Sequence, residues 1–272
     1  MWIAAAIVMA ITIAACLSNR FNTQSDIIEL SITFSLLCVV GLSFKTLTIQ
    51  HLRPLILLTS LIYFGFIAGG CNCILFYFQG FILFLMGKSA FWLSFVVIAT
   101  ILVLSVIFGP IWCGWICWLG ALQEFIFQKN RWNLLKTKKT QKILIYIQTV
   151  ALVALVIWII FTQRPVLCGY DPFISIFKIK IFHWIGYITV PLLLLSSLFI
   201  YRPFCRILCP IGWLLYVVKF IPFSAQLKLT DCTNCGKCHS YCKINAIHDK
   251  VIEKTCLMCG ECKKEQCKFI TL

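Results

Sequence analysis

The sequence has few charged residues and is particularly poor in acidic ones. Charged residues make up 12% of its 272 residues, and 9 Asp and Glu stand against 24 Lys and Arg, for a formal net charge of +15. Soluble globular chains are about one quarter charged, whereas this one is 61% hydrophobic. The composition therefore excludes an ordinary soluble protein and predicts that most of the chain lies in lipid.

The sequence also lacks the common nucleotide-binding motifs. It contains neither G-x-G-x-x-G nor G-x-x-x-x-G-K-[ST], the elements that hold dinucleotides and nucleoside triphosphates. We therefore expect no bound dinucleotide or nucleoside triphosphate.

Apolar runs near the length of a membrane-spanning helix occupy much of residues 1–223. A helix needs roughly 20 apolar residues to cross a bilayer. The first run lacks a basic start and a convincing cleavage site, which favours a retained helix over the alternative of a signal peptide. The run from Cys71 to Met86 is broken by Gly80, which suggests a re-entrant or interfacial segment. The six predicted spans are about 2–17, 27–44, 54–70, 91–108, 143–161 and 185–201.

The last 45 or so residues are polar and contain two runs of four closely spaced cysteines, a pattern typical of two-cluster ferredoxins. The predicted fold is therefore an all-α transmembrane helical bundle of about six helices, followed by a small C-terminal α+β domain of the two-cluster ferredoxin type. Residues 1–53 hold two N-terminal transmembrane helices, 54–223 form a four-helix membrane core with paired C-x3-C motifs, and 224–272 form the ferredoxin-type domain. Two parts of the chain are thus expected to lie in different solvents.

The positions of the basic residues predict the orientation in the membrane, because short cytoplasmic loops are rich in Lys and Arg. The loops between Lys129 and Lys142 and around Lys45 and Arg53 are basic. We therefore expect the ferredoxin-type domain to be cytoplasmic, in a bacterial or archaeal inner membrane, with 71–90 and 162–184 outside. Anionic lipid headgroups account for the remaining positive charge, and no nucleic-acid partner is needed.

The C-terminal cysteines form two runs of four with the spacing of iron–sulfur ligands. The first run reads C-x2-C-x2-C-x3-C and the second C-x2-C-x2-C-x4-C. In two-cluster ferredoxins three close cysteines bind one cluster and the fourth reaches across to the other. This predicts two [4Fe-4S] clusters, whose iron is held by a first quartet, Cys232, Cys235, Cys238 and Cys267, and by a second quartet, Cys242, Cys256, Cys259 and Cys262.

Zinc binding and a disulfide framework are the alternatives for these eight cysteines. A zinc site needs four ligands and usually shows two separated pairs, and a reducing cytoplasm disfavours structural disulfides. Two details depart from the ferredoxin pattern: Lys243 stands where a proline usually follows the fourth cysteine, and one extra residue precedes Cys267. We do not expect either to abolish ligation.

A second group of cysteines occurs in two similar segments, GPIWCGWICWLGALQE at 109–124 and YRPFCRILCPIGW at 201–213. A glycine follows the second cysteine by three positions in both, which indicates an internal repeat. If the backbone is helical, each C-x3-C pair shares one face. The four thiols are candidates for a third metal or iron–sulfur centre at the membrane edge, and plain packing is the alternative. They are Cys113, Cys117, Cys205 and Cys209.

With these motifs, the chain resembles NapH-type membrane 4Fe-4S binding proteins over roughly residues 54–272, and their NosR-type and CcoG-type relatives. The family usually has C-x3-C-P at both membrane sites; here Pro210 is kept, but Trp118 replaces the first proline. The NapH resemblance implies electron transfer between the quinone pool and a redox partner protein, as in a quinol dehydrogenase. The CcoG resemblance implies the alternative, a metal-reducing assembly factor for a respiratory enzyme.

Other candidate residues carry weaker signals. Glu124, Asp171 and His183 are candidates for the base that takes protons from a quinol, although a structural role is the simpler interpretation of each. Cys71, Cys73 and Cys168 form a third group at the outer helix ends. A disulfide, a metal site and simple packing remain open for that group.

Overall fold

The computed structural model describes residues 48–67, 74–127, 137–167, 172–178, 184–229, 241–248, 251–262 and 269–271. The two predicted N-terminal helices lie outside these residues. In order, the elements up to the first repeat segment are α3 (Thr48–Ser60), the π-helix η1 (Leu61–Ile67), α4 (Ile74–Leu85), the 3-10 helix η2 (Ser89–Phe91), α5 (Trp92–Phe108), the π-helix η3 (Trp112–Ile116) and α6 (Trp118–Ile126).

The remaining helices are α7 (Lys138–Thr162), α8 (Pro172–Phe177), α9 (Gly186–Phe199), α10 (Pro203–Ile207) and α11 (Pro210–Val218). Four short strands follow, β1 (Leu227–Leu229), β2 (Ile247–His248), β3 (Val251–Ile252) and β4 (Phe269–Thr271). The described part is therefore mostly helical, and its few strands belong to the predicted C-terminal domain.

Two of the described helices are long and apolar enough to cross a membrane, judged by length and composition: Ser89–Phe108 and Lys139–Thr162. Only 17% of the apolar window of the second is buried inside the protein. Its exposed apolar surface, which includes Tyr146 and Phe161, suits contact with lipid. This supports association with a membrane.

The other predicted spans within the described residues are helices shorter than a full span. Leu52–Ile67 and Gly186–Phe199 correspond to the predicted spans 54–70 and 185–201. The segment predicted to be re-entrant forms the regular helix Ile74–Leu85. It packs on α5, and Gly80 lies against the side chain of Ser94 at their contact.

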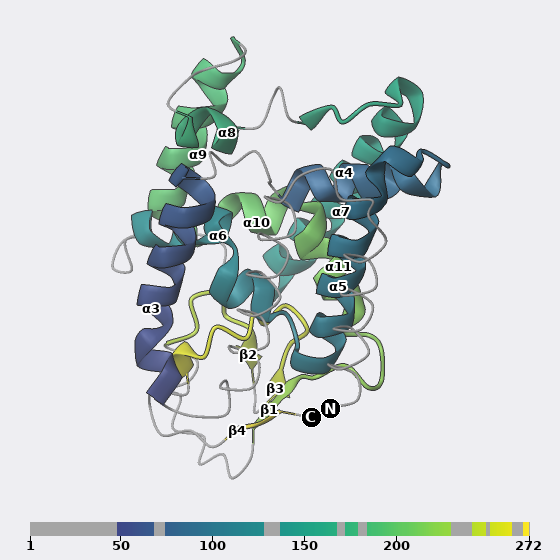
Figure 1. The fold of residues 1–272 in the computed structure, drawn as a ribbon. Helices are drawn as coiled ribbons and strands as arrows, with labels where there is room; N and C mark the ends of the chain where they lie inside the picture. The colour runs from purple at the N-terminus through teal and green to yellow at the C-terminus, as the bar shows by residue number, and fades with distance from the viewer. Residues whose placement is uncertain are drawn as a thin grey trace.

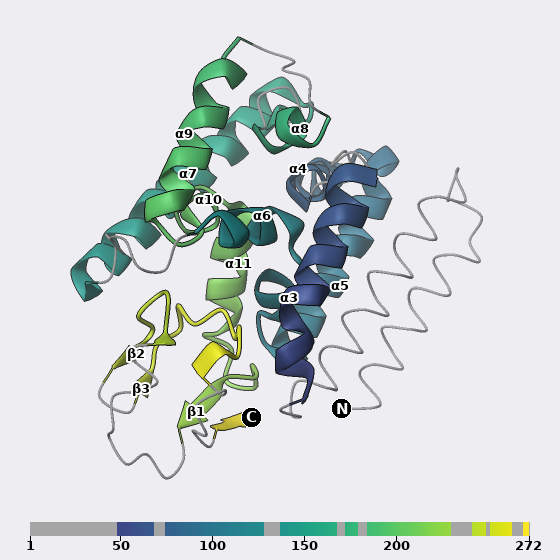
Figure 2. The same cartoon turned by 90° about the vertical axis from the view of Figure 1, so that its left-hand side faces the viewer.

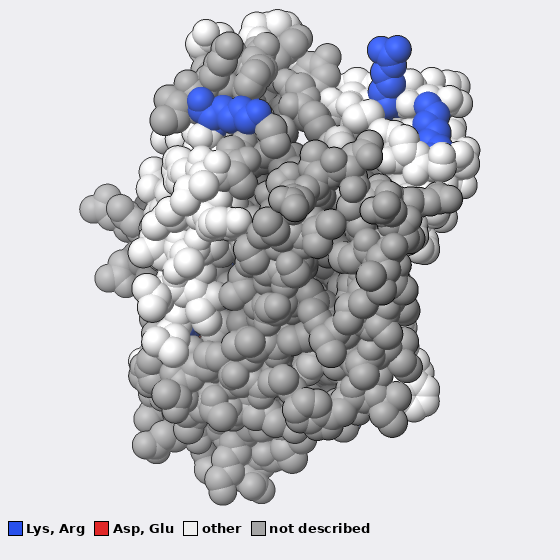
Figure 3. Space-filling model, in the orientation of Figure 1, with Lys and Arg blue, Asp and Glu red and all other residues white. Residues whose placement is uncertain are grey.

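The two loops predicted to share the outer side of the membrane meet each other. Lys88 Nζ donates to the carbonyl oxygen of Gln163 at 2.7 Å. The buried side chain of Gln79 accepts hydrogen bonds from the backbone N–H groups of Val166 and Leu167 at 2.6 and 2.9 Å. Described Lys and Arg side chains gather at this end in Figure 3.

The strands lie at the opposite end of the molecule from α8 and α9 (Figure 1). β1 pairs antiparallel with β4, and β2 pairs antiparallel with β3. Figure 2 shows the short helices α6 and α10 in the middle of the molecule, between the long helices and the strands. Because α6, η3 and α10 belong to the repeat segments, both C-x3-C motifs lie on the side of the helices that faces the described strands.

Candidate iron–sulfur sites

The first C-x3-C pair spans a break between two helices. Cys113 lies in the π-helix η3, whereas Cys117 has φ −59° and ψ 109° and precedes α6. The backbone is therefore not one continuous helix across the pair, so the condition under which both cysteines would share one face is not met. π-Helical turns are rare and are frequent at functional sites.

The second pair repeats this arrangement. Cys205 lies in α10, and Cys209 has φ −70° and ψ 117° immediately before α11, which begins at Pro210. The break at Cys209 follows from Pro210, since the residue before a proline is driven to extended backbone and proline suits the first position of a helix. Cys117 adopts similar backbone angles without a following proline. Both segments thus place their second cysteine at the start of a nine-residue helix.

The four thiols of the two pairs influence one another. Burial raises the pKa of the Cys113 thiol, and the thiols of Cys117, Cys209 and Cys205 raise it further, while Arg202 lowers it. The pKa of Cys205 is likewise raised by burial first and then by Cys117 and Cys209. The fold therefore brings cysteines about 90 positions apart into one group, which we call the membrane-edge cysteines.

Two glutamine side chains hold the segments that carry these cysteines. Gln123 accepts a hydrogen bond from the Phe204 backbone N–H at 2.9 Å and donates to Cys205 Sγ at 3.5 Å. Gln148 of α7 donates to the carbonyl oxygens of Cys209 and Cys205 at 2.7 and 3.3 Å. These bonds link the two segments to each other and to a membrane helix.

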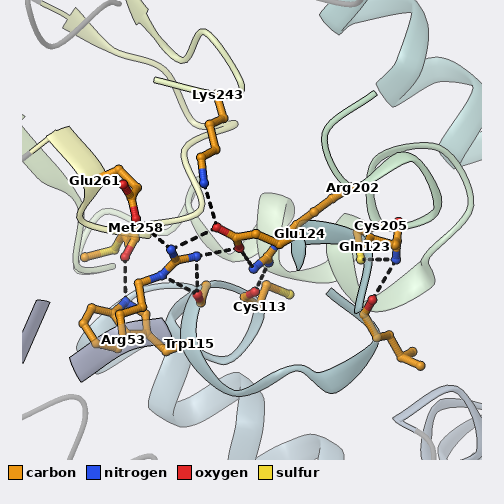
Figure 4. A network of polar contacts seen from close by, with 12 residues as sticks. Arg53, Cys113, Trp115, Gln123, Glu124, Arg202, Cys205, Lys243, Met258 and Glu261 are labelled. Atoms are coloured by element: carbon orange, nitrogen blue, oxygen red, sulfur yellow. Dashed lines mark hydrogen bonds and ion pairs between the residues drawn. The ribbon is translucent and has the colours of Figure 1, made fainter. Parts of the chain in front are cut away.

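A buried charge network lies next to the membrane-edge cysteines (Figure 4). Glu124 Oε2 lies 2.7 Å from Arg53 Nη2 and 2.5 Å from Arg202 Nη2, and its Oε1 lies 3.0 Å from Lys243 Nζ. Burial raises the pKa of the Glu124 carboxyl, but the three cations outweigh it and hold that pKa far below its usual range. Glu124 is therefore a permanent anion and a poor candidate for the quinol base.

The same arginines hold the backbone around Cys113. Arg53 donates to the Gly114 carbonyl oxygen through Nε and Nη2 at 3.2 and 3.1 Å, and Arg202 donates to the Cys113 carbonyl oxygen. Arg202 has a positive φ of 50°, a conformation that costs of order 1–3 kcal/mol in residues other than glycine. Its contacts with Glu124 and Cys113 hold it there.

The structure describes all four cysteines of the second predicted quartet. Burial raises the pKa of Cys262, and Cys259, Cys256 and Cys242 raise it further, so the four thiols form one interacting group. Burial also raises the pKa of Cys256, to about 11. The Ala246 N–H donates to Cys242 Sγ at 3.2 Å, and the Met258 N–H donates to Cys256 Sγ at 3.4 Å. Cys242 thus meets a triplet that begins 14 positions later.

Several other predicted residues lie outside the described part of the chain. They include the whole first quartet, Cys232, Cys235, Cys238 and Cys267, and also Cys71, Cys73, Cys168, Asp171 and His183. Within the first quartet, Cys235 to His239 also reads C-x-x-C-H, the attachment motif of c-type haem. Its position inside C-x2-C-x2-C-x3-C favours a cluster instead.

The loop that carries the second quartet packs directly on the η3 helix of Cys113. Trp115 Nε1 donates to the Met258 carbonyl oxygen at 3.1 Å, as Figure 4 shows. A Cβ atom on Gly114 would lie 2.5 Å from the Leu257 carbonyl oxygen. Gly109, with φ 80° and ψ −174°, lies against Met258 in a conformation open essentially to glycine. The second quartet and the membrane-edge cysteines are therefore neighbours.

The residues of both groups have the chemistry of [4Fe-4S] ligands. None of their described cysteines is in a disulfide, four of the eight are buried and four are partly buried. The thiols interact within each group, and Arg202 or backbone N–H groups act on several of them. In the part of the chain that the structure describes, no three Cys, His, Asp or Glu side chains converge tightly enough for a single metal ion. A cubane does not require that convergence, because each of its four thiolates binds a different iron atom.

Sequence reasoning missed most of the residues that join the two groups. Arg53 was interpreted only as a marker of orientation, and Lys243 only as a departure from a ferredoxin pattern. An arginine at the edge of an apolar run is a signal, since charges at membrane depth usually pair. Nothing in the sequence, however, indicates that both cations would reach Glu124.

Comparisons with known proteins agree with these sites. The model of a 4Fe-4S binding domain matches residues 90–139 and 182–221, which include both C-x3-C pairs. The chain is 29% identical over 229 residues to an uncharacterised protein of Methanocaldococcus jannaschii, covering 81% of this chain and 93% of the relative. No solved structure matches the chain.

Two further relatives have descriptive names. The chain is 27% identical over 184 residues to YccM of Escherichia coli, a putative electron transport protein, covering 62% of this chain and 51% of that one. It is 27% identical over 171 residues to protein NirI of Paracoccus denitrificans, covering 56% of this chain and 24% of NirI. The chain thus spans about half of YccM. The resemblance to membrane 4Fe-4S proteins of the NapH and NosR type is confirmed at modest identity.

Proposed function

From the relationship of this iron–sulfur protein to NapH-type and NosR-type proteins, we propose that it is membrane-bound and passes electrons between the quinone pool and a redox partner protein. In this proposal Cys232, Cys235, Cys238 and Cys267 hold one [4Fe-4S] cluster, Cys242, Cys256, Cys259 and Cys262 hold a second, and the membrane-edge cysteines hold a third. The last assignment is supported by the match of the 4Fe-4S domain over both of their segments.

The observation that carries this proposal is the contact between the two described cysteine groups. The Met258 carbonyl oxygen accepts the indole N–H of Trp115, and Gly114 leaves no room for a side chain beneath Leu257. Cysteines on helices next to lipid thus lie beside cysteines of a polar domain. An electron carrier that links a lipid-soluble donor to a water-soluble partner needs such an arrangement.

When bound, a [4Fe-4S] cluster supplies a one-electron carrier whose potential depends on hydrogen bonds to its sulfurs, net charge and solvent exposure. The chain provides each of these controls. N–H groups face Cys242 and Cys256, and Arg202 interacts with Cys113 and Cys205. Cys113 is itself buried, and so are the nearby residues Trp112, Trp115 and Trp118, which limits the solvent exposure of this segment.

The surface next to Cys205 limits how a quinol can approach. A partly open pocket of about 60 Å³ is bordered by Cys205, Arg206, Gln148, Tyr216 and Thr255, among others. This space has the volume of a few water molecules and is too small for a quinone ring. A quinol is therefore expected to react at the edge of the site, from the lipid side of α7, and to release its protons to groups other than Glu124.

The membrane orientation is part of the proposal. We place the C-terminal domain on the cytoplasmic side of a bacterial or archaeal inner membrane, because the basic segment 129–142 runs into the first turns of α7 and basic segments next to membrane helices favour that side. Gln141, near the start of α7, donates to the Ile244 carbonyl oxygen of the C-terminal domain at 2.8 Å, which supports a common side. The redox partner is then expected in the cytoplasm or at its membrane surface.

Low-temperature EPR on anaerobically purified full-length protein in liposomes tests this function. Spectra are recorded before and after a menaquinol analogue is added, and again after dithionite. We expect the quinol to reduce clusters that dithionite also reduces, and we expect Cys113→Ser and Cys205→Ser to abolish quinol reduction. Cys38→Ser, which changes a cysteine outside both groups, is the matched control.

Clusters that dithionite reduces but the quinol analogue does not would contradict the quinol-linked function. In that case the metal-reducing assembly factor becomes the better hypothesis. Reduction of added Cu²⁺ to Cu⁺ by the dithionite-reduced protein would then distinguish that function from a redox sensor, which carries no steady electron flux.

A further inference from the structure

Lys219 is a buried cation at the contact between the two cysteine groups. It directly follows α11 and is 5% exposed. Its Nζ donates to the carbonyl oxygen of Lys254 at 2.6 Å and to that of Cys256. The side chain thus holds the loop of the second quartet at the point where its cysteine triplet begins.

Burying an ammonium group is costly unless anions or several acceptors compensate it. Two neutral carbonyl oxygens compensate only part of that cost. Burial lowers the pKa of Lys219, and Cys256 and Cys113 raise it. The negative charge of cysteine-bound clusters would compensate the remainder.

Lys219 lies where both cysteine groups meet. Its Nζ contacts the Cys256 carbonyl oxygen, and the next two residues of that loop, Leu257 and Met258, lie against Gly114 and Trp115 beside Cys113. Cys256 and Cys113 both interact with the Lys219 ammonium. The same Lys219 also lowers the pKa of Cys256, second only to the effect of burial. Arg202 is a further cation that interacts with the membrane-edge cysteines. The backbone of Lys219 is held by Gln226, which donates to its carbonyl oxygen at 2.6 Å.

We propose that Lys219 is a positioning residue shared by two redox sites. Its ammonium holds the Cys256 loop against the membrane core, and its charge stabilises the reduced state at both the Cys113 and the Cys256 sites. This inference rests on the proposed function, because both sites must hold clusters. A positive charge favours the more negative, reduced form of a cluster. Lys219 is therefore expected to raise both midpoint potentials.

The test is an EPR-monitored redox titration of the full-length protein in liposomes, with dithionite and mediators as the only redox reagents. Lys219→Met keeps the length of the side chain but removes its charge, and Lys219→Arg keeps the charge. Lys254→Met is the matched control, because Lys254 lies on the same loop but its Nζ stands over the Phe220 ring, 3.4 Å from the centroid.

For Lys219→Met we expect the equilibrium constant for reduction of two of the clusters to fall about tenfold. This lowers their midpoint potentials by roughly 59 mV for a one-electron couple. Lys219→Arg should retain both native potentials, and Lys254→Met should shift neither. Unchanged potentials in Lys219→Met, a shift of one cluster only, or an equal shift in Lys254→Met would overturn the inference.

If Lys219→Met loses cluster signals altogether, the signals of Lys219→Arg show whether the charge at this position is required. Native signals in the arginine variant show that the charge at this position is required, whereas their loss shows that only the shape of lysine matters and contradicts the proposal. Since no quinol is used, a failure here is distinguishable from a failure of quinol-linked electron transfer.

Discussion

Lys243 Nζ lies 3.0 Å from Glu124 Oε1, although 119 positions separate the two residues. Lys243 follows Cys242 of the second quartet, and Glu124 ends the GALQE sequence that follows Cys117. The position at which ferredoxins usually have proline is therefore used here to join the C-terminal domain to the membrane core. The ammonium also stands over the Tyr201 ring, 5.3 Å from its centroid.

Replacing Lys243 by Met should loosen this junction without unfolding the protein. Glu124 keeps both arginines, and the Lys243 side chain is 19% exposed, so we expect a loss of about 1 kcal/mol. Hydrogen–deuterium exchange of residues 241–262 measures the effect. Lys228→Met, on the exposed face of β1, is the control, and equal protection in both variants would contradict the role of Lys243.

Replacing Glu124 by Gln should have a much larger effect. The side chain keeps its shape, but Arg53 and Arg202 lose the anion that compensates their burial, which typically costs about 3–5 kcal/mol. Thermal loss of the iron–sulfur absorption in nanodiscs measures stability. Glu261→Gln removes a more exposed partner of Arg53 and should cost less; the reverse order would show that Glu124 is not the centre of the network.

The stability difference between the wild type and Glu124→Gln should not change between pH 8 and pH 5. The folded pKa of Glu124 is lowered from 4.5, so its stabilising effect is fully present above the unfolded pKa and declines as the pH falls below that value. Denaturant unfolding at several pH values measures it. A difference that already narrows between pH 7 and pH 6 would mean that a histidine or thiol dominates.

Introducing a side chain at Gly114 should separate the Cys256 loop from η3. A Cβ at this position would lie 2.5 Å from the backbone oxygen of Leu257, which cannot move as a flexible side chain could. We expect Gly114→Val to cost about 1–3 kcal/mol and to increase protease cleavage after residue 241. Gly87→Ala strains a positive φ in open space and serves as the control; similar cleavage in both would exclude a specific contact.

Iron content should identify the ligands of each cluster. Three clusters correspond to about 12 iron atoms per chain, and losing one removes about four. We expect Cys259→Ser and Cys117→Ser each to remove about four, and the double variant about eight. No loss from Cys117→Ser would indicate that the membrane-edge cysteines hold no cluster.

Local features of the chain were predictable because they depend on neighbouring residues. The apolar runs at 91–108 and 143–161 correspond closely to α5 and α7, since a long apolar run determines a helix by itself. The assignment of Cys242 to the triplet at Cys256 is a prediction from ferredoxin spacing, and in the fold the four thiols interact with one another. The repeat of the C-x3-C segments was likewise visible in their residues.

Backbone details at the cysteines were not predictable. A spacing of four suggested one helical face, but the chain leaves the helix at Cys117 and at Cys209. For Cys209 the following proline is a local cause. For Cys117 the cause is tertiary, because Arg53 and Arg202 bind the carbonyl oxygens of Gly114 and Cys113 just before it.

The sequence by itself determined which residues are apolar enough for lipid and which cysteines are spaced to hold iron, because both properties depend on short stretches of chain. Only the tertiary structure decided which groups meet. Arg53, Glu124, Arg202 and Lys243 come from four separate segments and form one network, and Lys219 lies between two cysteine groups. Buried charges need partners at atomic contact, and only the packed fold selects those partners among distant segments.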